Sequence, residues 1–109
     1  MTTPQIANLE KLLGTPRDGA LLRLALGNAY LAAGERERAI AQLREALARE
    51  PQYSAAWNSL GKALAEAGRA DEALDAWRRG IEAARAKGDR QAEKEMTLFA
   101  RRLERKETR

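Results

Sequence analysis

The chain has 109 residues, of which 44% are hydrophobic and 33% charged, and its formal net charge is +4, a balance that predicts one globular domain with a modest core. Cysteine and histidine are both absent, which excludes disulfides, thiol chemistry and the usual zinc, haem and copper ligand sets, so no cofactor is expected. No stretch is apolar enough to span a membrane, and the first residues lack a secretory signal, so the sequence predicts a cytoplasmic protein.

The first predicted helix lies within residues 1–14. Thr3 and Pro4 form a helix start and Gly14 a helix stop. Between them runs an apolar stripe at helical spacing, made of Ile6, Leu9, Leu12 and Leu13. We expect this helix to cover the next one, over residues 20–33, as the second half of an incomplete repeat.

A second start signal follows at once. Thr15 and Pro16, with Asp18 two residues later, have the composition of a helix N-terminus. The sequence therefore predicts that the next helix opens early, before residue 20.

A nine-residue segment then occurs twice in similar form. The chain reads LGNAYLAAG at residues 26–34 and LGKALAEAG at residues 60–68, which is 34 residues later. Residues 20–53 laid over 54–87 without a gap share six small or apolar positions. The pairs are Leu26 and Leu60, Gly27 and Gly61, Gly34 and Gly68, Ala39 and Ala73, Leu43 and Trp77, and Ala46 and Gly80.

Each copy contains two helical patterns separated by a glycine. Gly34 and Gly68 suit the left-handed conformation that ends a helix, so each copy is expected to form a helical hairpin. Pro51 forces the preceding residue out of helical geometry and so separates the first hairpin from the second.

Two further glycines fall inside the first helix of each hairpin. Gly27 and Gly61 each cost about 1 kcal/mol of helix stability against alanine, so something must compensate. The expected compensation is close approach of the second helix, through Ala39 in the first hairpin and Ala73 in the second.

The period of 34 and the recurring residues resemble the tetratricopeptide repeat. The first copy supplies the signature residues Leu26, Gly27, Tyr30 and Pro51, and the second supplies Trp57, Leu60 and Gly61. Departures from the signature stand at Arg23, Leu64 and Arg85. The resemblance covers residues 20–87 and implies an all-α fold of antiparallel helical hairpins, stacked in a short right-handed superhelix of about six helices. It also implies that Trp57 is a packing residue wedged between its own helix and the next.

A last helix is predicted over residues 90–106, after a stop and restart at Gly88 and Asp89. Its apolar face consists of Ala92, Met96, Phe99 and Leu103. No register reproduces the Leu-Gly signature there, so this helix is expected to cap the solenoid. The predicted single domain 1–109 thus divides into an N-terminal packing helix at 1–14, repeats at 20–53 and 54–87, and a capping helix with a basic tail at 88–109.

The sequence offers no catalytic constellation. Without histidine or cysteine there is no familiar pair of nucleophile and base. Gly61 and Lys62 do not form a phosphate-binding loop, because Ala56 and Ala63 occupy the places of its glycine and its Ser or Thr. Neighbouring carboxylates occur in the first turns of helices, where they favour the positive end of the helix dipole. We therefore predict a protein that is not an enzyme.

Positive charge gathers at the C-terminal end. Residues 78–109 carry 11 basic and 6 acidic side chains, whereas residues 1–77 carry 9 and 10. Arg101, Arg102 and Arg105 form a basic surface that suits contact with nucleic acid or an acidic protein. A solvated helix end explains the same charges, and this interpretation is favoured because no aromatic or glycine-rich nucleic-acid motif accompanies them.

The resemblance implies a concave groove lined by the first helix of each hairpin. Its expected residues are Leu21, Leu24, Asn28 and Leu31 from the first repeat, and Asn58, Lys62 and Ala65, beside Ala55, from the second. Each set follows one side of a helix. The apolar first half and the polar, positive second half predict a peptide or helical segment with apolar anchors beside an acidic stretch.

Two alternatives stay open at this stage. A neighbouring helix or a second copy of the chain would also account for the groove leucines, and a second copy would make the protein a scaffold that forms homo-oligomers. The basic C-terminal helix leaves weak nucleic-acid binding as a further alternative, which the absence of a supporting motif disfavours.

Overall fold

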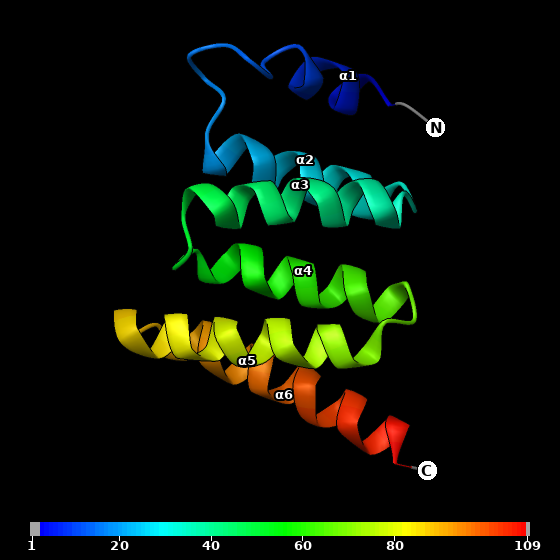
Figure 1. Ribbon diagram of the computed structural model, residues 1–109, viewed down its shortest axis with the longest axis vertical. Coiled ribbons are helices and arrows are strands. Elements are labelled where there is room, and N and C mark those ends of the chain that lie inside the picture. The colour runs from blue at the N-terminus through cyan, green and yellow to red at the C-terminus, as the bar shows by residue number, and fades with distance from the viewer. Residues whose placement is uncertain (1–2, 109) are drawn as a thin grey trace.

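The computed structural model describes residues 3–108, which form six α-helices and no strand. The helices are α1 (Pro4–Glu10), α2 (Ala20–Ala32), α3 (Arg36–Arg49), α4 (Ser54–Glu66), α5 (Ala70–Lys87) and α6 (Arg90–Glu107). They follow one another along the longest axis of an elongated molecule of 42 × 31 × 19 Å (Figure 1). The predicted all-α fold of stacked helical hairpins is confirmed.

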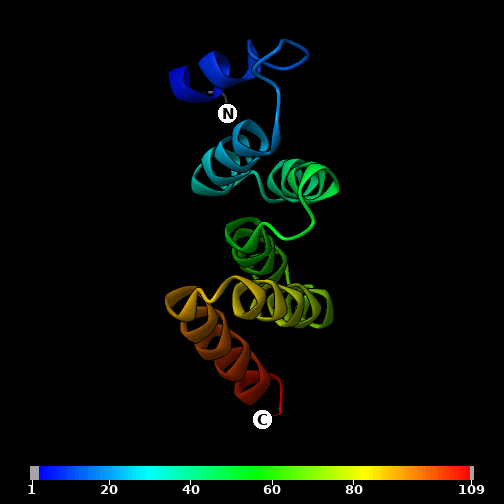
Figure 2. The same cartoon turned by 90° about the vertical axis from the view of Figure 1, so that its left-hand side faces the viewer.

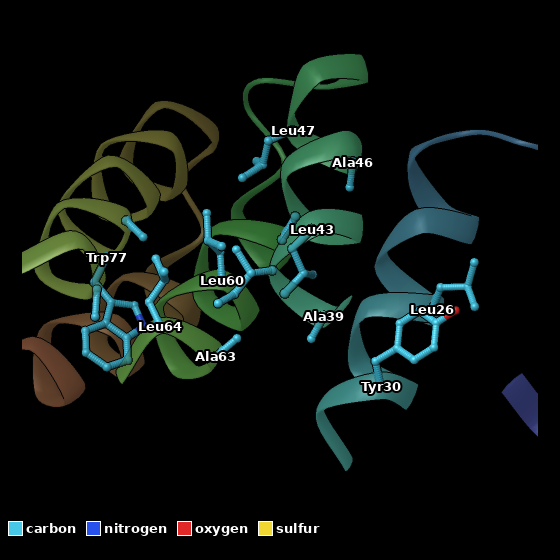
Figure 3. Close-up of a cluster of buried hydrophobic side chains, with 14 of the residues drawn as sticks. Leu26, Tyr30, Ala39, Leu43, Ala46, Leu47, Leu60, Ala63, Leu64 and Trp77 are labelled. Carbon is cyan, nitrogen blue, oxygen red and sulfur yellow. The ribbon is translucent and has the colours of Figure 1, made fainter. Parts of the chain in front are cut away.

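The helices form two layers. Helices α2, α4 and α6 lie along one side of the stack, and α3 and α5 lie along the other (Figure 2). The core fills the space between these layers, and Figure 3 shows Leu43, Leu60 and Leu64 within it. Neighbouring helices of the first layer also touch one another, since α2 contacts α4 and α4 contacts α6.

The turns within the hairpins depend on the predicted glycines. Gly34 and Gly68 adopt φ angles of 78° and 77°, in the left-handed region that disfavours any residue with a side chain. The next residue closes the helix in each case, because the Glu35 N–H donates to the Tyr30 carbonyl at 2.9 Å and the Arg69 N–H to the Leu64 carbonyl at 2.9 Å.

The glycines inside α2 and α4 are explained by close packing, through residues that differ from the expected ones. A Cβ added at Gly27 would lie within 3.0 Å of Leu43, and one added at Gly61 would lie within 3.0 Å of the Trp77 indole. The expected partners Ala39 and Ala73 are not the residues that make this approach. The larger side chains one turn further along α3 and α5 make it instead.

Both tryptophans pack against the core, Trp57 between α4 and α5 as the signature implies and Trp77 more deeply. The Trp77 side chain is buried, with 3% exposure, and its ring stacks on Phe99 with centroids 5.7 Å apart. Trp57 is only half-buried, and its indole Nε1 donates to the Pro51 carbonyl at 2.9 Å. Trp77 is therefore the more deeply buried of the two tryptophans, and Trp57 packs against the core with part of its ring exposed.

Helix α1 packs against α2, as predicted. The Thr3 hydroxyl caps it by accepting from the Ile6 N–H at 3.1 Å, and Ile6 is 1% exposed. The Tyr30 hydroxyl of α2 donates to the Glu10 carboxylate at the end of α1. The helix is shorter than expected, because residues 11–14 form turns.

The expected early start of the second helix is wrong, since α2 begins at Ala20. Asp18 explains the difference: its carboxylate accepts from the Gly14 N–H at 2.9 Å and holds the guanidinium of Arg23 through two hydrogen bonds of 2.9 Å each. These bonds, above all those from Arg23, lower the pKa of Asp18 from 3.8 to about 2. Residues 15–19 are thus a structured turn that positions α2.

Helix α6 covers the last exposed side of the second hairpin. The Asp89 carboxylate caps it by accepting from the Ala92 N–H at 3.1 Å. Met96 and Ala100 are buried against α5, while Phe99 and Leu103 are partly buried. The predicted capping helix is present, one residue longer than expected.

Candidate functional site

The predicted groove residues all lie on α2 and α4, in the layer that also contains α6 (Figure 2). On α2 the Leu21 side chain is 72% exposed, Asn28 is exposed, and Leu24 and Leu31 are half-buried. The three expected residues of α4 are half-buried. This layer therefore presents an apolar surface over α2, with no other helix of residues 3–108 covering Leu21.

A hydrogen bond joins the two helices across the groove. The Ser59 hydroxyl donates to the Asn28 side-chain oxygen at 2.7 Å. Asn28 thus reaches toward α4 from the middle of α2, and the apolar residues Leu24 and Leu31 lie one turn to either side of it on α2.

Asn58 lies between helices instead of opening to solvent. Its Nδ2 donates to Glu95 of α6 at 2.9 Å, and its Oδ1 accepts from the buried Trp77 Nε1 at 3.1 Å. Both ends of the amide are engaged within the chain. In the chain alone Asn58 therefore satisfies the buried indole N–H of Trp77, and its contact with a ligand stays a prediction.

The charge of Lys62 is also matched within the chain. Its Nζ lies 3.6 Å from Glu95 Oε1 and 5.0 Å from the centroid of the Phe99 ring. The predicted positive half of the groove is consequently close to neutral on α4. Sequence reasoning missed Glu95, because the 34-residue repeat covers residues 20–87 and does not place the residues of the last helix beside α4.

The predicted basic residues Arg101, Arg102 and Arg105 lie exposed on the second half of α6. Within residues 3–108, none of their side chains forms an ion pair or hydrogen bond. Leu98, on the same helix, is 46% exposed. The basic surface therefore contains an apolar side chain.

A hollow lies on the opposite side, between α3 and α5 over α4. It encloses about 630 Å³ and has an apolar base that includes Leu47, Leu60 and Leu64, with Trp57 at its edge. Sequence reasoning did not foresee it, since it depends on the separation of two helices that are not adjacent in sequence.

Ion pairs occupy the rim of this hollow. Arg44 of α3 lies 3.2 Å from Glu72 of α5, and Arg79 lies 3.0 Å from Asp75 and stacks over the Trp57 ring. Arg69 donates to Glu72 and, with Arg44, lowers its pKa. Because these rim charges already have partners, the hollow has few free polar groups with which to select a ligand.

With this geometry described, comparison with known proteins settles the family. Residues 24–89 match the family model described as tetratricopeptide repeat, which is more than half of the chain. The chain belongs to the tetratricopeptide repeat family. Repeats of this family generally serve as non-catalytic modules for interaction between proteins.

Individual proteins resemble more than nine-tenths of the chain. A TPR repeat-containing protein of Pseudomonas aeruginosa is 48% identical over 103 residues, covering 94% of this chain and 98% of that protein. A Bordetella parapertussis protein of known solution structure has a TM-score of 0.83 and 40% identity, covering 97% of this chain and 91% of the other. The TPR domain of Sgt2 from Aspergillus fumigatus has a TM-score of 0.80 and 28% identity, covering 93% and 64%.

Two other features are absent from the described residues. Residues 3–108 contain no cluster of carboxylates that would hold a metal ion. Over the same residues, no helix of this tetratricopeptide repeat protein has the length and apolarity needed to cross a bilayer.

Proposed function

We propose that this protein is a non-catalytic interaction module that binds a peptide or helical segment of a partner protein in the groove over α2 and α4. The observation that carries the proposal is the apolar row on α2, where Leu21 is 72% exposed beside half-buried Leu24 and Leu31. A leucine that exposed on a layer of closely packed helices contributes little to folding and about 1.5–3 kcal/mol when fully buried by a partner.

The groove is short, which bounds the affinity. Two hairpins supply only a few apolar contacts, and ordering a flexible peptide costs conformational entropy. The expected dissociation constant is therefore micromolar, unless two copies of the chain bind together.

The proposal is tested by capturing partners from the native cell with the wild-type chain and with a double variant, Leu21→Glu and Leu24→Glu. Ala41→Glu is the matched control, because Ala41 is exposed on α3, outside this groove. The double variant should lose the partners that wild type and control both capture, while circular dichroism shows unchanged helicity. If a well-folded double variant keeps every partner, the groove is not the binding site.

The same exposed leucines favour a second function, association of two copies of the chain. Sedimentation equilibrium distinguishes the two, since a dimer that Leu21→Glu dissociates assigns the groove to self-association. A wild-type chain that stays monomeric at high concentration leaves the groove to a different protein.

A further inference from the structure

Helix α6 is the last helix of the layer that contains α2 and α4 (Figures 1 and 2). Contacts between successive helices of this layer are equivalent. Ser59 of α4 bonds to Asn28 of α2, and in the same way Glu95 of α6 pairs with Lys62 of α4. Asn28 and Lys62 are 34 residues apart, whereas Ser59 and Glu95 are 36 apart. Helix α6 therefore repeats the placement of α4 with a step of 36 residues.

This step shows which residues of α6 face the open end of the solenoid. On α4, Asn58 and Lys62 contact the next helix of the layer, because both lie against Glu95 of α6. Lys94 and Leu98 stand 36 residues after them. No helix of residues 3–108 covers these two side chains, and Leu98 is 46% exposed. A further helix added to the layer would therefore lie against Lys94 and Leu98.

Unpaired positive charge surrounds Leu98. Arg90, Lys94, Arg101 and Arg105 share its side of α6, because they lie 8, 4, 3 and 7 residues from it along the helix. All four are exposed, and within residues 3–108 none of their side chains forms an ion pair or hydrogen bond. We call these five residues the end face. It carries four cations and no carboxylate.

Three acids of α6 lie on its other sides, toward the neighbouring helices. Glu95 bonds to α4. Glu93 pairs with Arg85 of α5 at 2.8 Å, and Glu104 pairs with Arg78 of α5 at 3.3 Å. These carboxylates are therefore engaged with α4 and α5, and the cations of the end face are left to an acidic group from outside the chain.

A second hollow, of about 450 Å³, opens beside Leu98. Lys94 and Arg101 line it, and so do Arg85 and Glu93, which form an ion pair with each other. Because that pair balances its own charges, Lys94 and Arg101 make the hollow positive. A carboxylate next to an apolar side chain is the arrangement that such a surface suits.

The contact at this end is looser than those inside the solenoid. Gly61 lets α5 approach α4 closely, since a Cβ there would lie within 3.0 Å of Trp77. Thr97 stands 36 residues after Gly61, and its hydroxyl donates to the Glu93 carbonyl at 2.8 Å. Its side chain keeps an added helix further away than α5 is from α4. We therefore expect a reversible contact at this end.

We propose that the end face binds an acidic amphipathic helix of a partner protein, which stacks on α6 and extends the layer by one helix. Carboxylates of this helix meet Lys94 and Arg101, and an apolar side chain covers Leu98. The site lies at the end of the solenoid, outside the groove over α2 and α4, and it does not depend on the function proposed for that groove.

A second copy of the chain fits this surface less well. Two end faces placed together would bring Lys94 and Arg101 of both copies against each other, and like charges repel. At the other end of the solenoid the exposed side chains of Gln5, Asn8 and Lys11 carry no negative charge. Charge complementarity therefore favours a different protein as the occupant.

A nucleic acid is the other anionic ligand to consider. Single strands are bound through aromatic rings on which bases stack. The end face has no aromatic residue, and Phe99 of the same helix is stacked on Trp77. The exposed leucine and the absence of a free ring favour a polypeptide.

The test uses two fluorescein-labelled synthetic peptides of 18 residues, the length of α6. One forms a helix with leucines along one side and glutamates beside them, and the other has glutamine in place of every glutamate. Fluorescence anisotropy should show micromolar binding of the acidic peptide, weakened as salt rises, and binding of the glutamine peptide weaker by about tenfold or more.

Variants of α6 then locate the peptide. Lys94→Gln with Arg101→Gln should weaken binding of the acidic peptide about tenfold, and Leu98→Ala about fivefold. Arg102→Gln with Lys106→Gln is the matched control, because it removes the same charge from other sides of the same helix. The control should leave the affinity unchanged. All of these side chains are exposed, so folding is expected to be preserved.

The remaining outcomes would overturn the proposal. Equal weakening by the control would show a general effect of charge, and binding that Leu21→Glu weakens while the α6 variants do not would place the peptide in the groove. Tighter binding of a labelled single-stranded oligonucleotide that depends on Arg101 would make nucleic acid the ligand. A dimer that Leu98→Ala dissociates, seen by sedimentation equilibrium, would assign the end face to a second copy. Capture of partners with the Leu21→Glu and Leu24→Glu variant tests the groove independently of these results.

Discussion

The first and second hairpins place different side chains on the same backbone. In the first, the aromatic ring is Tyr30 of α2 and the residue over the inner glycine is Leu43 of α3; in the second, these positions hold Leu64 and Trp77. All four side chains are buried. The large ring has moved from one helix to the other while total volume is roughly maintained, which is the kind of exchange that a packed core tolerates.

The two hairpins also anchor their first helices differently. Arg23 in α2 is held by Asp18 through an ion pair of 2.9 Å, whereas the equivalent Trp57 in α4 bonds to a backbone carbonyl. The comparison shows that the small residues fix the spacing of the helices, and that the large and charged residues around them can differ between copies.

The largest effect is expected from truncating the buried ring. Trp77→Ala should lower the free energy of unfolding by about 3–5 kcal/mol, because it removes a buried indole, its stacking on Phe99 and the partner of Asn58. Trp57→Ala should cost about half as much, since that side chain is half-buried. Urea denaturation of both variants measures the difference, and an equal or larger loss for Trp57→Ala would reverse the assigned roles.

Substituting the glycines inside α2 and α4 tests how tightly Leu43 and Trp77 pack against them. Gly61→Ala should lower the free energy of unfolding by about 2 kcal/mol, because the rigid indole of Trp77 blocks the new methyl group. Gly27→Ala should lower it by less, about 1 kcal/mol, since the aliphatic Leu43 is smaller than the indole and alanine favours the helix. Thermal denaturation provides the measurement.

The second hairpin can be given the leucine that the first hairpin has over its inner glycine, by adding Trp77→Leu to Gly61→Ala. The smaller side chain should leave room for the methyl group of the new alanine. A double-mutant cycle should give a favourable coupling energy between the two positions. Additive effects would show that the ring and the glycine do not determine each other.

A smaller, pH-dependent effect is expected at Asp18. Its pKa in the folded chain is about 2 against an ordinary 3.8, so the ion pair with Arg23 stabilises the fold above pH 3.8 and loses that contribution as the pH falls toward 2. The difference in melting temperature between wild type and Asp18→Asn should therefore shrink over this interval. A difference that stays constant down to pH 2 would show that Asp18 acts without its charge.

The smallest effect is expected in the groove. Lys62 and Glu95 are each 41% exposed, so Lys62→Met should change the free energy of unfolding by about 0–1 kcal/mol. Chemical denaturation checks this value, and a loss above 2 kcal/mol would mean that the pair holds α6 in place.

The sequence predicts those parts of the fold that depend on local geometry. Gly34 and Gly68 stand out because few other residues adopt a positive φ, and the 34-residue period follows from spacing alone. The position of the first helix is harder to predict, since Thr15 and Pro16 imitate a helix start and only the bonds of Asp18 show that they form a turn.

The candidate site was less predictable because it depends on tertiary partners. The sequence alone does not show that the Asn58 amide accepts a hydrogen bond from the indole of Trp77. It also does not show that Glu95 lies beside Lys62 and balances its charge.

The small interface between α1 and α2 affects the order in which the helices unfold. This helix has 7 residues with Ile6 as its buried side chain, whereas α6 has 18 residues and buries Met96 and Ala100. A solenoid loses structure from its ends, and the end with the smaller interface opens first. Amide protons of α1 should therefore exchange with solvent fastest, followed by those of α2 once Tyr30 is uncovered, so that the apolar end of the groove is also the more readily unfolded one.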